Sequence, residues 1–268
     1  MKYLARTLLL LWALVLLCGC GGGERTSTPS AGPPPQGLVI AGNWQFSTTS
    51  MAGMPALTIA GSINQSGDAV SGAVHVDGSN CFDQLTTMGW TGTLTGSNIS
   101  LTSTSVMGQV STFTGSIVGT AFTGTYAING GCADGDQGNV TGIRIPLIAD
   151  QLDGTFTTSG NATFQVVAQL TQGSASSEGS FGITGTATFS TSCFSSGIIT
   201  SGTLPSGSFI IGTFVALQIE TDNGTLAFHG TANQSTGEIS GTYGIFGGTC
   251  DQTGTAVLVA SNSNPWDY

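Results

Sequence analysis

The sequence contains the same pattern of residues twice, and this duplication limits the chain to folds built from two equivalent halves. The segment FTGTYAINGGC at 122–132 matches ISGTYGIFGGTC at 239–250, and NCF around Cys81 matches SCF around Cys193. The offset is 112 residues from Cys81 to Cys193 and 117 residues from Tyr126 to Tyr243, so small loop insertions separate the copies. Two tandem modules of about 110 residues are therefore predicted.

Each copy alternates apolar and polar residues in short runs rich in Thr, Val, Ile and Phe, between clusters of Gly, Ser, Asn and Asp. Alternation with period two is typical of strands that bury one face. The predicted fold is all-β, with two tandem antiparallel up-and-down barrel or sandwich modules of about eight strands each. In the first copy the strands are predicted at 43–48, 57–65, 69–77, 86–95, 98–105, 109–118, 120–128 and 138–147.

The predicted domain boundaries place the first module at 42–149, the second at 150–262 and a short tail at 263–268. Sixteen alternating strands could also form a single membrane-spanning barrel, because alternation does not say which face is wet. The separate cysteine pairs of the two copies, the signal described below and the lack of clear aromatic girdles favour two modules instead.

One hairpin can be predicted in detail. The dipeptide Asn223-Gly224 is typical of a two-residue hairpin loop, which would set Ile219 opposite Phe228 on the apolar face.

Residues 1–20 carry the features of an export signal with a site of lipid attachment. Lys2 and Arg6 precede an apolar run, Leu8 to Leu17, that is too short to cross a bilayer core as a helix. The following residues, LCGC at 17–20, resemble a bacterial lipobox. The resemblance implies removal of residues 1–19 and attachment of diacylglycerol and palmitate to Cys20. An ordinary signal peptide and an uncleaved anchor are the alternatives.

Residues 20–41 are predicted to be a tether, because their Gly- and Pro-rich composition offers almost nothing to bury. In lipoproteins of this kind, Gly21 after the lipidated cysteine, where Asp is absent, suggests release to the outer membrane of a Gram-negative bacterium. The predicted location is therefore the cell envelope, and the predicted partner is the lipid bilayer, through the acylated Cys20.

The charge of the chain excludes some partners. Lys and Arg together number 4 against 14 Asp and Glu, and the net charge is −10. Such a chain should repel nucleic acid and anionic lipid head groups, so neither is expected to bind.

Four cysteines remain beyond Cys20 and fit the duplication. Four thiols allow three connectivities, and equivalent copies favour Cys81 with Cys132 and Cys193 with Cys250. An exported compartment permits such bridges. A zinc site built from all four thiolates is not favoured, because no CxxC spacing is present.

No catalytic motif of the GxSxG, HExxH or Walker type occurs, so the protein is predicted not to be an enzyme. His75 and His229 alternate with inward residues, so both are predicted to point outward. Asp134, Asp136 and Asn139 resemble part of a calcium loop, with oxygen ligands at alternating positions. An acidic turn between strands is the other interpretation, so no cofactor is predicted, and calcium is the alternative for these three residues.

The stretch Gly42-Asn43-Trp44 on the first strand resembles the GxW motif of the lipocalins. In that family the Trp closes one end of an eight-stranded barrel and an Arg from the last strand packs across it, which implies a role for Arg144 on the last predicted strand. An alignment of the copies gives Phe156 for Trp44 and Ala256 for Arg144. A core Trp of an unrelated β module is the alternative interpretation.

The sequence is therefore consistent with two alternative functions. The first is a non-catalytic binding or structural module of the cell envelope, with another envelope protein as a partner. The second is a lipocalin-like carrier of a small apolar ligand. A lined cavity in the first copy favours the carrier, and a filled interior favours the non-catalytic module.

Overall fold

The computed structural model describes residues 38–82, 86–148 and 150–261. The predicted signal segment, Cys20, the tether as far as residue 37 and the tail at 263–268 lie outside these ranges. Within the ranges the chain forms seventeen strands. Among the described residues we find no helix with the length and apolar composition needed to cross a membrane.

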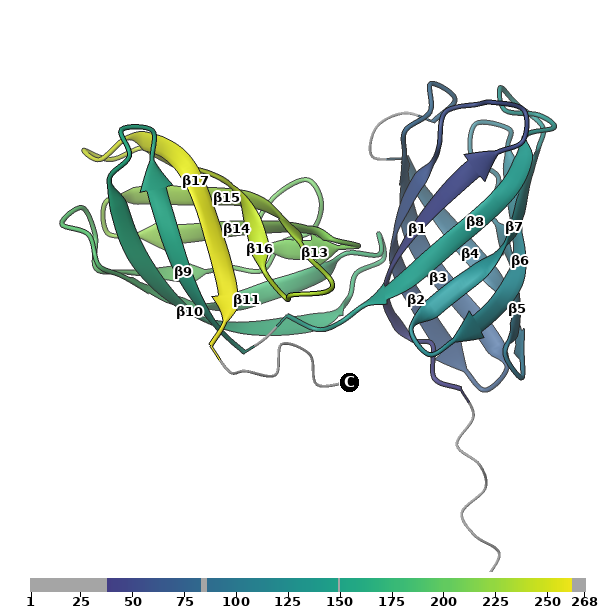
Figure 1. The fold of residues 1–268 in the computed structure, drawn as a ribbon, viewed down its shortest axis with the longest axis horizontal. Coiled ribbons are helices and arrows are strands. Elements are labelled where there is room, and N and C mark those ends of the chain that lie inside the picture. The colour runs from purple at the N-terminus through teal and green to yellow at the C-terminus, as the bar shows by residue number, and fades with distance from the viewer. Residues whose placement is uncertain (1–37, 83–85, 149, 262–268) are drawn as a thin grey trace, which may run out of the picture. The chain divides into compact units, whose positions relative to one another are not determined.

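The first copy forms a closed antiparallel barrel of eight strands, here called barrel one (Figure 1). Each strand pairs with the next along the chain, and β8 pairs with β1 to close the ring. All eight lie within two residues of their predicted bounds. The strands are β1 (Gly42–Ser50), β2 (Thr58–Ser66), β3 (Ala69–Asp77), β4 (Thr86–Thr95), β5 (Asn98–Ser103), β6 (Val110–Val118), β7 (Ala121–Asn129) and β8 (Gln137–Ile145).

The second copy forms a second barrel, barrel two, from a sheet of nine strands (Figure 1). β12 and β13 both pair with β11 and with β14, so together they fill one position in the ring. Pairing of β10 with β11 and of β17 with β9 closes the barrel. The strands are β9 (Gln151–Thr158), β10 (Thr163–Ala175), β11 (Phe181–Phe189), β12 (Ser196–Ile199), β13 (Phe209–Ile211), β14 (Phe214–Thr221), β15 (Gly224–Ala232), β16 (Ile239–Phe246) and β17 (Gln252–Ala260).

The cross-strand pairs confirm the duplication. Phe113 lies opposite Tyr126 in barrel one, and Phe228 lies opposite Tyr243 in barrel two. Each Tyr also lies opposite a glycine of the last strand, Gly138 or Gly254. Because register decides which side chains face the core, identical pairs show that both copies place the same positions inside.

Glycines on the inner face make room for aromatic rings. A Cβ atom on Gly230 would lie 2.4 Å from the ring of Phe228, which is fully buried. A Cβ atom on Gly142 would lie 2.3 Å from the ring of Phe46, its partner on β1. Neither glycine could carry a side chain without moving the ring, so the glycine content follows from the size of the interior residues.

The first and last strands of the two barrels use opposite size patterns. In barrel one the large Phe46 on β1 pairs with Gly142 on β8. In barrel two the small residue is Gly154 on β9, and the large one is Leu258 on β17, whose Cδ2 atom would lie 2.4 Å from a Cβ on that glycine. Both pairs lie four residues from the Gly138 or Gly254 row, so they occupy the same place in each barrel.

Three hairpins at one end of barrel one share a turn type. Each has a two-residue loop that begins with a glycine in the left-handed region, at φ between 60° and 62°, and continues with a residue of negative φ. This arrangement matches a type II′ turn, whose twist fits the twist of the flanking strands. The glycines are Gly67, Gly96 and Gly119.

The predicted register of the β14–β15 hairpin is wrong by two residues. Leu217, and not Ile219, lies opposite Phe228, and Thr221 pairs with Gly224 around a loop of Asp222 and Asn223. An Asn-Gly type I′ loop requires positive φ at both residues, but only Gly224 has it, at 108°. A shift of two positions keeps every side chain on its predicted face.

Each barrel contains one disulfide, in the pairing that the duplication predicts. Cys81 is bonded to Cys132 in barrel one, and Cys193 is bonded to Cys250 in barrel two. The bonded cysteines are 51 and 57 positions apart in the sequence, so each bridge links loops that are distant along the chain.

Candidate functional site

One end of barrel one is closed by the segment that precedes β1. Ile40 is buried, and its backbone N–H donates to Oε1 of Gln65 at 2.8 Å. The Gln65 Nε2 atom donates to the carbonyl of Leu38 at 2.9 Å, and the Trp44 indole N–H donates to the carbonyl of Ile40 at 2.8 Å. Three hydrogen bonds from two side chains therefore hold this segment against the barrel.

The structure brings Trp44 and Arg144 together at the same end, as cross-strand partners on β1 and β8. Trp44 is fully buried, whereas Arg144 is half-buried. The Arg144 side chain lies across Gly42, where a Cβ atom would approach Nε to 2.9 Å, and its Nη1 donates to the Val39 carbonyl at 3.5 Å. The pair closes the barrel end and does not line an open mouth.

The predicted counterparts of these two residues in the second copy, Phe156 and Ala256, are wrong. Counting along the strands from the shared Tyr–Gly row, the partner of Trp44 in barrel two is Leu152 and that of Arg144 is Ala260. The alignment with Phe156 and Ala256 was displaced by four residues, because the copies differ in the size pattern of these strands.

The interior of barrel one is filled with aromatic rings in mutual contact. The ring of Phe46 lies 5.6 Å from that of Trp44, 5.4 Å from that of Trp90 and 5.7 Å from that of Phe122, between centroids. Trp90 continues the cluster to Phe113 at 4.8 Å. Rings at these separations are in van der Waals contact, so the centre of the barrel is occupied by its own side chains.

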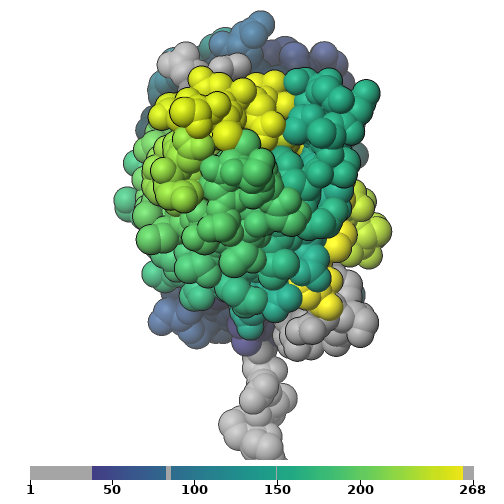
Figure 2. Space-filling view, turned by 90° about the vertical axis from the view of Figure 1, so that its left-hand side faces the viewer, coloured from purple at the N-terminus to yellow at the C-terminus, as the bar shows by residue number. Residues whose placement is uncertain are grey.

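Barrel two is filled in the same way. The Phe156 ring lies 5.2 Å from Phe164 and 4.9 Å from Tyr243, and Phe189 lies 4.7 Å from Phe194. The space-filling view in Figure 2 shows the end of this barrel that faces the reader covered by atoms of the second copy.

An amide side chain secures the disulfide end of each barrel. In barrel one the Gln109 Nε2 atom donates to the carbonyl of Cys81 at 2.8 Å, and its Oε1 accepts from the N–H of Ala133 at 3.1 Å. In barrel two the Asn223 Nδ2 atom donates to the carbonyl of Cys193 at 3.1 Å, and its Oδ1 accepts from the N–H of Thr249 at 3.0 Å. We call this arrangement the amide clasp.

Asp136 is buried, with 6% of its surface exposed, and is held by two hydroxyl groups. The Tyr126 hydroxyl donates to Oδ2 at 2.9 Å, and the Ser50 hydroxyl donates to Oδ1 at 2.5 Å. Burial raises the pKa of Tyr126 above its ordinary value of 10.0, and the hydrogen bond to Asp136 and its negative charge raise that pKa further. These contacts tie β1, β7 and the loop before β8 together.

The other two residues considered for calcium lie elsewhere on the same strand and loop. Asp134 is exposed, and its Oδ1 accepts from the N–H of Gly130 at 2.6 Å. Asn139 is exposed on the outer face of β8, opposite to the face of Gly138. In the ranges that the structure describes, no group of three or more His, Cys, Asp or Glu side chains is placed to hold a metal ion.

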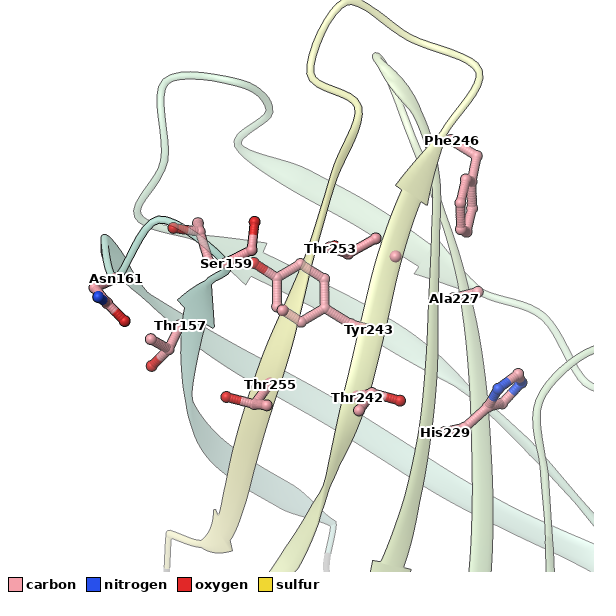
Figure 3. Close-up of a pocket in the computed structure, with 13 residues that line it drawn as sticks. Thr157, Ser159, Asn161, Ala227, His229, Thr242, Tyr243, Phe246, Thr253 and Thr255 are labelled. Carbon is pink, nitrogen blue, oxygen red and sulfur yellow. The ribbon is translucent and has the colours of Figure 1, made fainter.

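A groove of about 670 Å³ lies on the outer face of barrel two, over β15, β16, β17 and β9. Figure 3 shows Phe246 and His229 on one side of the groove and Thr157 and Asn161 on the other. Hydroxyl groups lie between them and along the rim; they belong to Ser159, Thr242, Thr253 and Thr255. The two small residues Gly244 and Gly254 line it as well.

Phe246 is the large apolar side chain of this groove, and 56% of its surface is exposed. Its ring lies over Gly244, because a Cβ atom there would approach Cζ of the ring to 2.3 Å. The inner face uses the same arrangement of ring and glycine to fill the core. On the outer face it presents an aromatic ring to solvent.

Barrel one has the same groove at the equivalent place, but it is smaller, about 270 Å³. Its lining residues match those of barrel two position by position along β6, β7 and β8, and they include Thr112, Thr114, Thr125, Tyr126, Ala127, Gln137 and Gly138. Asn129 occupies the position of Phe246, because each of them lies opposite the start of the preceding strand. Ala127 occupies the position of Gly244. The groove is therefore a feature of the module itself.

No Asp, Glu, Lys or Arg is among the residues that line either groove. Tyr243 forms part of the floor in barrel two, and burial raises the pKa of its hydroxyl. Unlike Tyr126, the Tyr243 hydroxyl has no hydrogen-bond partner among the described residues. The Tyr243 hydroxyl is buried inside the barrel, so the groove itself offers hydroxyl and amide groups, the imidazole of His229 and one aromatic face.

The sequence contained a signal for this site. Tyr243 faces inward, so strict alternation places Phe246, three residues later, on the outer face. An outward Phe in a strand is a departure from the binary pattern and points to a binding surface. His229 is exposed in the groove, as its outward orientation predicts, and His75 lies on β3 with Nε2 3.3 Å from the Thr87 hydroxyl.

Comparisons with known proteins give little to add to this geometry. No protein-family model matches the sequence, and no curated protein matches it. Among solved structures, the chain is similar to a candidate AttH protein from Nitrosomonas europaea, at 10% identity over 88% of this chain and 98% of that chain. The TM-score is 0.24, which is too low for the likeness to carry an argument about fold or function.

Proposed function

We propose that this protein is a lipid-anchored, non-catalytic module of the bacterial cell envelope that binds its partner on the outer surface of its barrels. The observation that carries the proposal is the aromatic interior of barrel one, where rings from β1, β4, β6 and β7 are in contact across the centre. A carrier of a small ligand needs a lined cavity, and such cavities are commonly several hundred Å³ in size. The groove on the outer face therefore becomes the candidate binding site.

Attachment to the membrane is supported by the lipobox-like residues at 17–20, and disulfides in both barrels are compatible with export. Replacement of Cys20 by Ser removes the thiol that would carry the lipid. We expect C20S protein to leave the membrane fraction and appear in the soluble periplasmic fraction or as an unprocessed precursor. Membrane association equal to that of the wild type would contradict the anchor.

The second candidate, a lipocalin-like carrier, is favoured by one observation, the pairing of Trp44 with Arg144 at a barrel end. The two functions differ in where an apolar ligand would bind. Titration of the full chain with a fluorescent fatty acid should leave the emission of the buried Trp44 and Trp90 unchanged if the interior is closed. Saturable quenching of these indoles, with energy transfer to the fatty acid, would support the carrier instead.

A further inference from the structure

The groove of barrel two has the chemistry of a site for a neutral, hydroxyl-rich ligand, and we infer that it binds a saccharide. The inference rests on the proposed function and names the ligand class of the same outer surface. Its lining combines hydroxyl and amide groups with one exposed aromatic ring, which are Thr157, Ser159, Asn161, Thr242, Thr253, Thr255 and Phe246.

The charge of the groove selects against other ligand classes. An anionic ligand is normally held by Arg or Lys, and a cation by carboxylates, yet neither kind of residue lines this groove. A purely apolar ligand would leave the many hydroxyl groups without partners, which costs binding energy. A neutral pyranose ring fits both restrictions, because its hydroxyls donate and accept hydrogen bonds while its C–H faces are apolar.

Phe246 supplies the stacking surface for such a ring. The side chain is exposed on one face, and its ring packs over Gly244 on the other. A pre-positioned aromatic ring loses little conformational freedom on binding, so more of the contact energy is kept as affinity. Thr253 lies opposite Gly244, the glycine under this ring, and Thr242 and Thr255 are cross-strand partners further along the same groove.

Barrel one provides an internal comparison. Its groove is smaller, and the hydroxyls of Thr114 and Thr125 lie 3.3 Å apart and bond to each other. The Thr112 hydroxyl donates to the carbonyl of Ala127 at 3.3 Å. Asn129 stands where barrel two has Phe246, so the stacking ring is missing. We therefore assign saccharide binding to barrel two.

The inference can be tested by saturation-transfer difference NMR on the full chain in a zwitterionic detergent, because maltoside or glucoside detergents are themselves neutral saccharides. The probes are linear hexamers of glucose, of N-acetylglucosamine and of galacturonate. We expect saturation transfer to at least one neutral hexamer and none to the acidic hexamer, since the chain carries a net charge of −10.

Variants locate the site. F246A should weaken binding about tenfold, the size of effect expected from loss of one stacking contact. T255V keeps the shape but removes a hydroxyl and should weaken binding about fivefold. V118A is the matched control, because Val118 is an apolar side chain of barrel one with 77% exposure, and its loss should change nothing. All three substitutions are at the surface, and circular dichroism checks that each variant is folded.

A gain-of-function variant completes the design. Replacing Ala127 by Gly and Asn129 by Phe in barrel one copies the ring and glycine of barrel two, and should restore part of the binding lost in F246A. Absence of transfer to every neutral hexamer, or equal binding by F246A and wild type, would overturn the saccharide inference but leave the proposed function standing. The proposed function would fail on a different result, namely quenching of Trp44 and Trp90 by the fatty acid.

Discussion

Tyr126 and Tyr243 occupy matching positions in the two barrels, yet their hydroxyl groups differ in what they contact. The first donates to the buried Asp136, and the second has no hydrogen-bond partner among the described residues. The two loops before the last strand differ in length and course, so Asp251 of the second copy is exposed and does not replace Asp136. A pair of identical substitutions can therefore separate the effect of a hydrogen bond from that of the ring.

We expect Y126F to lower the free energy of unfolding by about 1–2 kcal/mol, because Asp136 then remains buried with one donor fewer. We expect Y243F to change it by less than about 0.5 kcal/mol, because no hydrogen bond is lost. Urea denaturation of the two variants measures both values. A larger loss in Y243F than in Y126F would contradict the contacts described above.

The same two residues determine how stability depends on alkaline pH. Burial, and for Tyr126 also Asp136, raises their pKa above the value of 10.0 that holds in the unfolded chain. Above pH 10 the unfolded chain therefore releases protons that the folded barrels keep, so the free energy of unfolding falls as the pH rises toward the folded pKa. Below pH 10 these groups leave stability constant.

Urea midpoints measured at increasing alkaline pH should follow this course. The chain has one lysine, Lys2, in the predicted signal segment, so few other groups titrate in this range. The double variant Y126F/Y243F should show a flatter profile above pH 10 than the wild type. An unchanged slope in the double variant would assign the alkaline loss of stability to other groups.

At the scale of strands and hairpins, alternation predicted the elements well because one face of every strand is buried. Each predicted strand of the first copy falls within two residues of its observed position. The register of the β14–β15 hairpin was not predictable from the Asn-Gly dipeptide, because Asn223 takes part in the amide clasp and keeps negative φ. The hydrogen bonds of Gln109 were not predictable either, because its partners Cys81 and Ala133 are 28 and 24 residues away along the chain.

The candidate site was predictable only in part. The outward position of Phe246 follows from alternation, but the groove also requires that β9 lie beside β17, a contact that joins the two ends of the copy. Thr157 and Thr255 become cross-strand neighbours only through this long-range pairing. Alternation predicts which face of a strand a residue occupies. It does not predict which residues lie beside it where the first and last strands of the barrel pair.

The type II′ hairpins give a prediction at this scale. Gly96 begins the β4–β5 loop at φ 62°, and nothing lies within 4 Å of where its Cβ atom would be. Replacement by Ala is therefore free of steric contact, and its cost is that of the backbone conformation alone, about 1–2 kcal/mol. Thermal unfolding should show this loss for G96A and no comparable loss for S97A, the control at the next position. Equal stability of G96A and wild type would exclude the turn type described here.

At the scale of the whole molecule, each closed ring of strands predicts an independently folding unit. Ile148 is buried, and its N–H donates to Oε1 of Gln172 at 3.0 Å, so a fragment of barrel two should begin at Pro146 and not after it. Residues 146–268 should unfold cooperatively, and reduction of the Cys193–Cys250 bridge should cost up to about 4 kcal/mol by the chain-entropy model. A non-cooperative melt of the oxidised fragment, followed by far-UV dichroism, would show that barrel two needs barrel one to fold.

Two similar modules on one chain carry the hazard that a strand inserts into the wrong neighbour during synthesis. The opposite size patterns of the closing strands bear on that hazard. If β1 closed against β17, Phe46 would meet Leu258 in a space that holds one large side chain. If β9 closed against β8, Gly154 would meet Gly142 and leave a void. Overpacking and cavities both destabilise a core. The size patterns of the first and last strands therefore favour closure of each barrel by its own first strand over closure by that of the other barrel.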